Sequence, residues 1–146
     1  MILSIDNTIE RLTTHNAKIP FNAWLGIEVL AADAERVELR VPWRWEFGGA
    51  PGMTHGGILA SLIDTAAFLM LLAAKGTGGP TVDLHIDFHR STANGALYVS
   101  SSLLRAGGSI STVEVRINDQ ERRLIATGRC VFLTRSRLSR ESDQCA

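Results

Sequence analysis

The sequence predicts an α+β domain in which an antiparallel sheet of about six strands curls around one long central helix. The first observation is a segment, His55 to Lys75, that is apolar on almost every helical face. A helix of this kind needs other elements packed around it. The second observation is that two strand patterns precede this segment and four follow it. The third is that short turns join the four later strands, which is typical of antiparallel neighbours.

The chain before the strands is expected to be helical. Residues 2–16 carry apolar side chains at helical spacing, and Pro20 stops the pattern. A second short helical turn is expected at 21–25, so residues 1–25 form an N-terminal helical segment. At the other end, the polar residues 135–146 are expected to form a flexible tail.

Alternation with a period of two identifies the strands. Val37, Leu39 and Val41 alternate with charged residues, and the stretch from Thr81 to His89 alternates without a break. No internal repeat or linker interrupts the chain, so residues 1–146 are expected to form a single domain. The predicted strands are 27–32, 36–41, 81–89, 96–105, 109–117 and 122–134.

Composition excludes several classes of protein. The chain has 146 residues, with 15 basic and 15 acidic side chains, so a nucleic-acid partner is not expected. The two cysteines, Cys130 and Cys145, form no disulfide or zinc pattern. No apolar leader of signal-peptide length is present. Residues 58–74 are too short and carry a central charge, so no membrane partner is expected and a cytosolic protein is indicated.

Asp64 is the only charged residue within the body of the apolar segment. A carboxylate in such surroundings needs a compensating partner, or it becomes neutral. One interpretation is structural, in which Asp64 meets a buried donor or points through a gap in the sheet. The other is that Asp64 carries chemistry, because perturbed acids gather at functional sites.

The start of the apolar segment is the second signal. Thr54-His55-Gly56-Gly57 places two glycines at a helix N-terminus, where they cost about 1 kcal/mol each relative to alanine. Glycines allow another molecule to approach the backbone, and the free N–H groups there can bind an oxyanion. The alternative is that Thr54 caps the helix and its hydroxyl occupies the Gly57 N–H.

Helix geometry separates these two signals. Gly57 and Asp64 are seven residues apart, so they share a face but lie roughly 10 Å apart along the axis. One small reacting carbonyl cannot touch both residues of the same helix. If both act on one carbon, they come from different subunits, and the chain forms a homodimer with two shared sites.

The motif His55-Gly56-Gly57, followed by Leu62 and Asp64-Thr65-Ala66, resembles hotdog-fold acyl-CoA thioesterases of the phenylacetyl-CoA thioesterase (PaaI-like) group. The resemblance extends over nearly all of the chain after residue 20, including the strand at 81–90 and the closing stretch 124–128. It implies a hotdog fold and hydrolysis of an acyl-CoA, with an aryl, arylacetyl or medium-chain acyl group. It also implies a homodimer or homotetramer, without a metal or redox cofactor.

The resemblance assigns roles to individual residues. Asp64 matches the carboxylate that attacks the thioester carbonyl or activates a water, two roles that residue content does not separate. Gly57 matches the residue whose N–H polarises the carbonyl in the neighbouring subunit, and His55 matches the motif histidine. Further contacts with substrate are expected at Gly56, Phe68, Thr81, Val82 and Arg90.

The chain departs from the family pattern at one position near the motif. Many relatives carry an asparagine about six residues before the motif histidine, where this chain has Gly48-Gly49-Ala50. The departure supports a rival hypothesis, a non-catalytic acyl-CoA-binding module of the same fold. The retained Asp64 opposes that rival, because binding alone does not need a buried acid.

Two weaker patterns have two interpretations each. Trp43, Trp45 and Phe47 either line an acyl pocket or cover the open end of the central helix. Histidines two residues apart on one strand face could ligate a metal, although a solvated or subunit-facing strand gives the same alternation. The residues of that face are Asp83, His85, Asp87 and His89.

Overall fold

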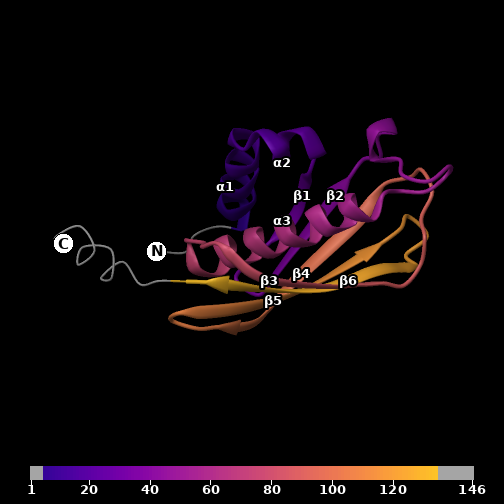
Figure 1. The fold of residues 1–146 in the computed structure, drawn as a ribbon. Coiled ribbons are helices and arrows are strands. Elements are labelled where there is room, and N and C mark those ends of the chain that lie inside the picture. The colour runs from indigo at the N-terminus through magenta and orange to yellow at the C-terminus, as the bar shows by residue number, and fades with distance from the viewer. Residues whose placement is uncertain (1–4, 135–146) are drawn as a thin grey trace.

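A computed structural model describes residues 5–134, in which one long helix lies in the hollow of an antiparallel sheet (Figure 1). All six predicted strands are confirmed, each within two residues of its expected ends. The predicted tail at 135–146 lies outside the described residues. The elements are α1 (Ile5–Lys18), α2 (Pro20–Leu25), β1 (Glu28–Ala32), β2 (Arg36–Val41), the 3₁₀ turn η1 (Trp45–Phe47), α3 (Gly56–Lys75), β3 (Thr81–Phe88), β4 (Leu97–Ala106), β5 (Ile110–Asn118) and β6 (Leu124–Leu133).

The strands form one sheet in the order β1-β2-β4-β5-β6-β3, with every neighbouring pair antiparallel. Tight hairpins join β4 to β5 and β5 to β6, as the sequence predicts. The chain leaves α3 and returns as β3 at the far side, so β1 and β3 are the two edges. Helix α1 contacts β1, whereas the outer edge of β3 is uncovered by the described chain.

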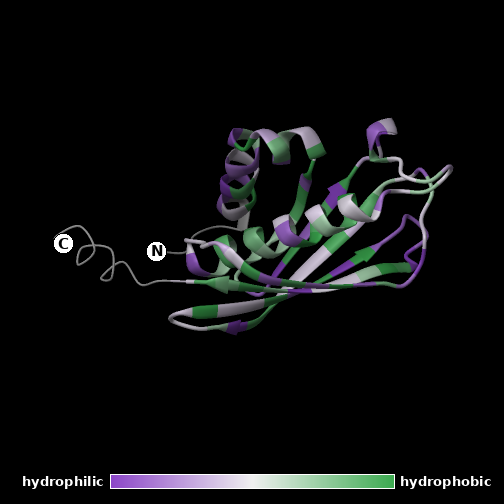
Figure 2. Cartoon of the chain, viewed as in Figure 1, coloured by the Kyte–Doolittle hydropathy of each residue, from purple (hydrophilic) through white to green (hydrophobic). Residues whose placement is uncertain are grey.

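Helix α3 supplies the centre of the hydrophobic core. Its fully buried side chains include Leu62, Ile63 and Met70, and they meet the inward-facing residues of the strands. Hydrophobic residues recur along α3 and the strands around it (Figure 2). Among the described residues, α3 is the one helix long and apolar enough to cross a membrane, and this packing makes it a core helix.

The sheet leaves one stripe of α3 uncovered, although the helix is apolar on almost every face. Gly57, Ser61, Asp64 and Phe68 recur at helical spacing, and all four are partly or fully exposed. The physical reason is that the sheet ends at β3 and therefore does not reach around this side of the helix. Asp64 needs no gap in the sheet to reach solvent.

The turn between β5 and β6 is organised by Asp119, which is only 3% exposed. Its Oδ1 accepts hydrogen bonds from the backbone N–H groups of Glu121 at 3.0 Å and Arg123 at 2.9 Å, and its Oδ2 accepts from Arg123 Nε at 2.8 Å. Burial alone would raise the pKa of this carboxyl. The bonds from Arg123 outweigh burial and hold the pKa below its ordinary value.

We expect Asp119→Asn to lower the free energy of unfolding by about 1–3 kcal/mol at pH 7, because a charge-assisted bond is lost. A lowered folded-state pKa stabilises the protein above the unfolded-state value of 3.8, and the effect is lost as the pH falls through the folded-state pKa. Urea unfolding at pH 7 and pH 3 should therefore show a smaller gap between the two proteins in acid. The control is Asp33→Asn in the exposed β1–β2 turn. A gap independent of pH contradicts this account.

Candidate active site

The first turn of α3 is capped by a side chain. His55 is the N-cap, with φ −64° and ψ 133°, and its Nδ1 accepts a hydrogen bond from the Gly57 N–H at 2.8 Å. The alternative in which Thr54 caps the helix is wrong. The Thr54 hydroxyl instead accepts from Trp43 Nε1 at 3.2 Å and donates to the Ala93 carbonyl at 3.5 Å.

The cap decides which N–H group of the turn is free. The Gly57 N–H is occupied by His55, whereas the Gly56 N–H has no acceptor within residues 5–134. A Cβ on Gly57 would lie 2.9 Å from His55 Nδ1, so a side chain there would displace the capping ring. Because Nδ1 accepts, the neutral imidazole carries its proton on Nε2. The positive end of α3 thus leaves the Gly56 N–H open to an oxyanion.

Asp64 lies two turns further along α3 and is half-buried. Its Oδ1 accepts a hydrogen bond of 2.7 Å from the Thr81 hydroxyl, and its Oδ2 has no partner in the described chain. Thr81 can make this bond because the register shifts between Thr81 and Asp83. Thr81 thereby pairs with the buried Phe132 and faces the helix. One carboxylate oxygen is anchored and the other is open.

Cys130 lies behind the acid, with its thiol directed at the Ile63 carbonyl at 3.8 Å. Burial raises the pKa of the Cys130 thiol to about 12, and the carboxylates of Asp64 and Asp83 add to the effect. A thiol of this kind stays protonated and is a poor nucleophile. Of these two side chains, Asp64 is the one whose chemistry suits a nucleophile or a base.

The other predicted residues lie in two places. Phe68 follows Asp64 by one turn, where it stacks on His15 with ring centroids 5.5 Å apart. Val82 is 57% exposed beside Thr81. Arg90 follows the opposite end of β3 and is exposed.

The predicted site residues other than Arg90 therefore form two groups, at two different points along α3. Asp64, Thr81, Val82 and Phe68 form the first group, while His55 and the two glycines form the second. Gly56 and Asp64 are eight residues apart, which is roughly 12 Å along a helix. The separation expected from the sequence is present.

Sequence reasoning missed Phe88 as a neighbour of the helix start. A Cβ on Gly56 would lie 3.4 Å from the Phe88 ring, which is itself 57% exposed. The alternation of β3 placed Phe88 on the apolar face of the strand. No sequence signal showed that this face reaches Gly56.

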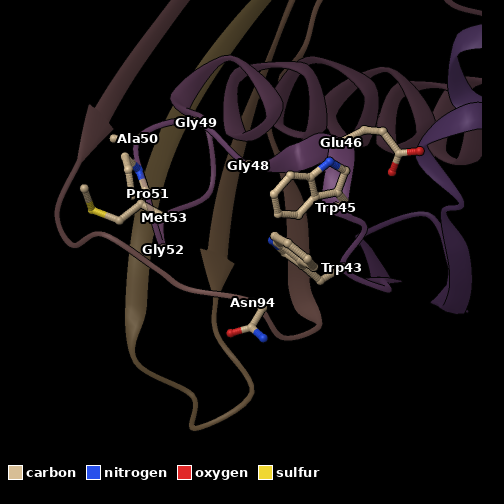
Figure 3. Close-up of a pocket in the computed structure, with 10 residues that line it drawn as sticks. All are labelled: Trp43, Trp45, Glu46, Gly48, Gly49, Ala50, Pro51, Gly52, Met53 and Asn94. Carbon is tan, nitrogen blue, oxygen red and sulfur yellow. The ribbon is translucent and has the colours of Figure 1, made fainter.

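The three aromatic residues of the loop divide between a cavity wall and the core. Trp43 and Trp45 line a cavity of about 510 Å³, whereas Phe47 is fully buried and packs against Trp24. The stretch 48–50, where relatives carry an asparagine, also lines this cavity. Asn94, from the connection between β3 and β4, brings an amide side chain to the same cavity (Figure 3). Asn94 carried no signal in the sequence, because the tertiary fold alone brings the two loops together.

The metal hypothesis for β3 gains no support. His85 Nε2 lies 3.2 Å from Asp87 Oδ2, and His89 Nε2 lies 2.7 Å from the Thr127 hydroxyl. Within residues 5–134, no three His, Cys, Asp or Glu side chains converge on one point.

Comparisons of the chain with known proteins agree on one family. Residues 51–126 match the model of the Thioesterase superfamily. A medium/long-chain acyl-CoA thioesterase from Escherichia coli, YigI, is 27% identical over 132 residues, which cover 79% of this chain and 85% of YigI. A solved structure of a thioesterase-superfamily protein is 35% identical, with a TM-score of 0.84, and the match covers 88% of this chain and 98% of that one.

The fold extends to a further solved structure, the Escherichia coli PaaI protein from the phenylacetic acid degradation operon. That protein is 18% identical, with a TM-score of 0.77 and coverage of 91% of this chain and 97% of PaaI. At this identity the likeness concerns the fold. The helix motif, the sheet order and these matches agree: the chain belongs to the thioesterase superfamily and is a hotdog-fold thioester hydrolase.

Proposed function

We propose that the chain is an acyl-CoA thioesterase that works as a homodimer, in which Asp64 of one subunit and the Gly56 N–H of the other act on the same thioester carbonyl. The observation that carries the proposal is the pair of unused groups on α3. One Asp64 oxygen and the Gly56 N–H both lack partners in the described chain, and helix rise holds them roughly 12 Å apart. A second α3 alongside the first would bring one of each together.

The exposed edge of the sheet at β3 is a second argument for a homodimer. Among residues 5–134, the outer edge of β3 presents an unpaired row of backbone groups, which natural proteins seldom leave open. Its apolar residues Val82, Leu84 and Phe88 are exposed, and the partly uncovered stripe of α3 lies on the same side. A second copy placed with β3 against β3 would cover all of these surfaces and extend the sheet.

The names of relatives support the substrate class. YigI is named for medium- and long-chain acyl-CoA, and PaaI belongs to a phenylacetic acid operon. For this chain we propose an aryl, arylacetyl or medium-chain acyl-CoA as substrate, and a carboxylic acid and coenzyme A as products. A purely binding role is not favoured, because such a role leaves the open Asp64 oxygen without use.

The chemistry divides between the two subunits. The Gly56 N–H stabilises the negative charge that grows on the carbonyl oxygen. In the other subunit, Asp64 either attacks the carbonyl carbon or takes a proton from an attacking water. In either route the C–S bond then breaks, and coenzyme A leaves as a thiolate that takes up a proton. If water attacked, its oxygen is already part of the released acid; if Asp64 attacked, a mixed anhydride forms, which water hydrolyses to the acid and free Asp64. The Thr81 hydroxyl holds Oδ1 of Asp64 and thereby aims Oδ2 at the substrate.

Replacing the acid tests its role. We expect Asp64→Asn to lower kcat by roughly a thousandfold, because the amide can act neither as nucleophile nor as base. Free thiol release from a panel of short aliphatic, arylacetyl and hydroxybenzoyl-CoA esters measures the effect, with Ser61→Ala, one turn before Asp64, as the control. Equal activity of wild type and Asp64→Asn would refute the catalytic role.

Removing the donor tests the assignment to Gly56. Proline fits the first position of a helix and lacks the N–H, so Gly56→Pro should fold and lose about 100–1,000-fold in kcat. Gly56→Ala places a Cβ in the same contact with Phe88 but keeps the N–H, so it should stay within a few fold of wild type. If both variants are equally impaired, crowding rather than the lost donor explains the defect.

Mixing inactive subunits tests the sharing of sites. Random exchange between Gly56→Pro and Asp64→Asn subunits gives about half mixed dimers, and each mixed dimer holds one intact site, so about a quarter of wild-type activity should return. Co-expression with two tags isolates the mixed dimer. A mixed dimer as inactive as its parents means that both groups act within one chain, and a monomeric active wild type would exclude the shared site.

The threonine that anchors the acid is the last test of this mechanism. Thr81→Val removes the hydroxyl that donates to Asp64 and should lower kcat about tenfold with little change in KM. Thr81→Ser keeps the donor and should restore most of the rate. Failure of serine to restore activity would show that the methyl group, not the hydrogen bond, is required.

A further inference from the structure

The 510 Å³ cavity lies outside the group formed by Asp64 and Thr81, and its size is typical of a small-molecule site. Two indoles, a thioether, one amide and a glycine-rich backbone make up its walls (Figure 3). The lining residues include Trp43, Trp45, Glu46, Gly49, Met53 and Asn94.

Hydrogen bonds hold the two sides of the cavity in place. Trp43 Nε1 donates to the Thr54 hydroxyl, which fixes the indole. The Thr54 N–H donates to the Thr92 carbonyl at 2.8 Å, and the Thr54 hydroxyl donates to Ala93. These bonds tie the loop that carries Asn94 to the residue directly before His55. The cavity is therefore built into the fold before any ligand arrives.

The charge of the cavity excludes the nucleotide part of coenzyme A. Its lining holds one charged side chain, Glu46, which lies 3.8 Å from Arg44 outside the lining. No lysine or arginine lines it, so the phosphates of coenzyme A would find no cation among the lining residues. The occupant that fits is uncharged. The indole faces favour a flat ring, and the Asn94 amide, unpartnered among the described residues, can bond a polar substituent.

The cavity adjoins the proposed oxyanion donor. Gly49 forms part of its wall, and a Cβ on Gly49 would lie 3.0 Å from His55 Cα. His55 in turn precedes the free Gly56 N–H. A carbonyl held by that N–H would therefore lie close to the cavity of the same subunit.

We infer that this cavity is the acyl subsite, in which an aromatic ring lies against Trp43 and Trp45 while Asn94 bonds a hydroxyl or similar group on the ring. The inference rests on the proposed thioesterase function and deepens it. For any one bound substrate, Asp64 then comes from one subunit and the acyl subsite from the other. Trp45, which is 84% exposed without a ligand, is buried when the ring binds.

The test compares phenylacetyl-CoA with cyclohexylacetyl-CoA, which has the same carbon count but a puckered ring, and with 4-hydroxyphenylacetyl-CoA. Trp45→Leu should lower kcat/KM for phenylacetyl-CoA about 5–10-fold more than for cyclohexylacetyl-CoA. Asn94→Ala should lower kcat/KM for the hydroxylated ester about 5–10-fold more than for phenylacetyl-CoA. Phe21→Leu removes an exposed aromatic outside the cavity and should change none of these ratios.

Binding without turnover separates the two proposals. Tryptophan fluorescence follows titration with the amide analogue of phenylacetyl-CoA, in which nitrogen replaces the thioester sulfur. Binding that weakens in Trp45→Leu supports the subsite even if wild type hydrolyses no ester, in which case the thioesterase proposal alone fails. If wild type hydrolyses the esters but Trp45→Leu and Asn94→Ala affect all of them equally or not at all, the acyl group does not enter the cavity and this inference is overturned.

Discussion

The fixed rise of α3 inside the sheet is the constraint from which the rest of the site follows. Side chains such as Leu62, Ile63 and Met70 are completely buried, so the helix cannot slide or unwind without exposing the core. Its N-terminus and Asp64 are therefore held roughly 12 Å apart. At one end the Gly56 N–H, and at the other end Oδ2 of Asp64, has no hydrogen-bond partner among the described residues. Under our proposal, catalysis belongs to the assembly, because one rigid helix cannot place both groups on one carbonyl.

The first turn of α3 illustrates how one local arrangement serves both stability and chemistry. The His55 ring caps the helix through Gly57, and that bond leaves the Gly56 N–H free. Glycines at this position cost about 1 kcal/mol each in helix propensity. The apolar burial along the remainder of α3 offsets that cost. A side chain at Gly57 would crowd the capping ring, so glycine at this position favours the cap.

Much of the fold could be predicted from sequence because it rests on local patterns. The alternation of Val37, Leu39 and Val41 defines β2, and the one long apolar run defines α3. The hydrogen bond from Thr81 to Asp64 was harder to predict. The bulge that turns Thr81 toward the helix is not visible in the alternation of polar and apolar residues. The sequence suggested the Gly57 N–H as the free donor, whereas in the described chain the N–H without an acceptor is that of Gly56. Sequence spacing does not show which N–H group a side chain will bond. Asn94 could not be found at all, because it is distant in sequence and joins the cavity only through tertiary contacts.

The most direct test of the account is a crystal structure with the amide analogue of an acyl-CoA bound. The account predicts a carbonyl oxygen about 2.7–3.2 Å from the Gly56 N of one subunit, with the carbonyl carbon facing Asp64 of the other. The acyl group should lie in the cavity beside Trp43 and Trp45. A carbonyl bound by the Gly57 N–H, or held by groups of a single chain, would contradict it.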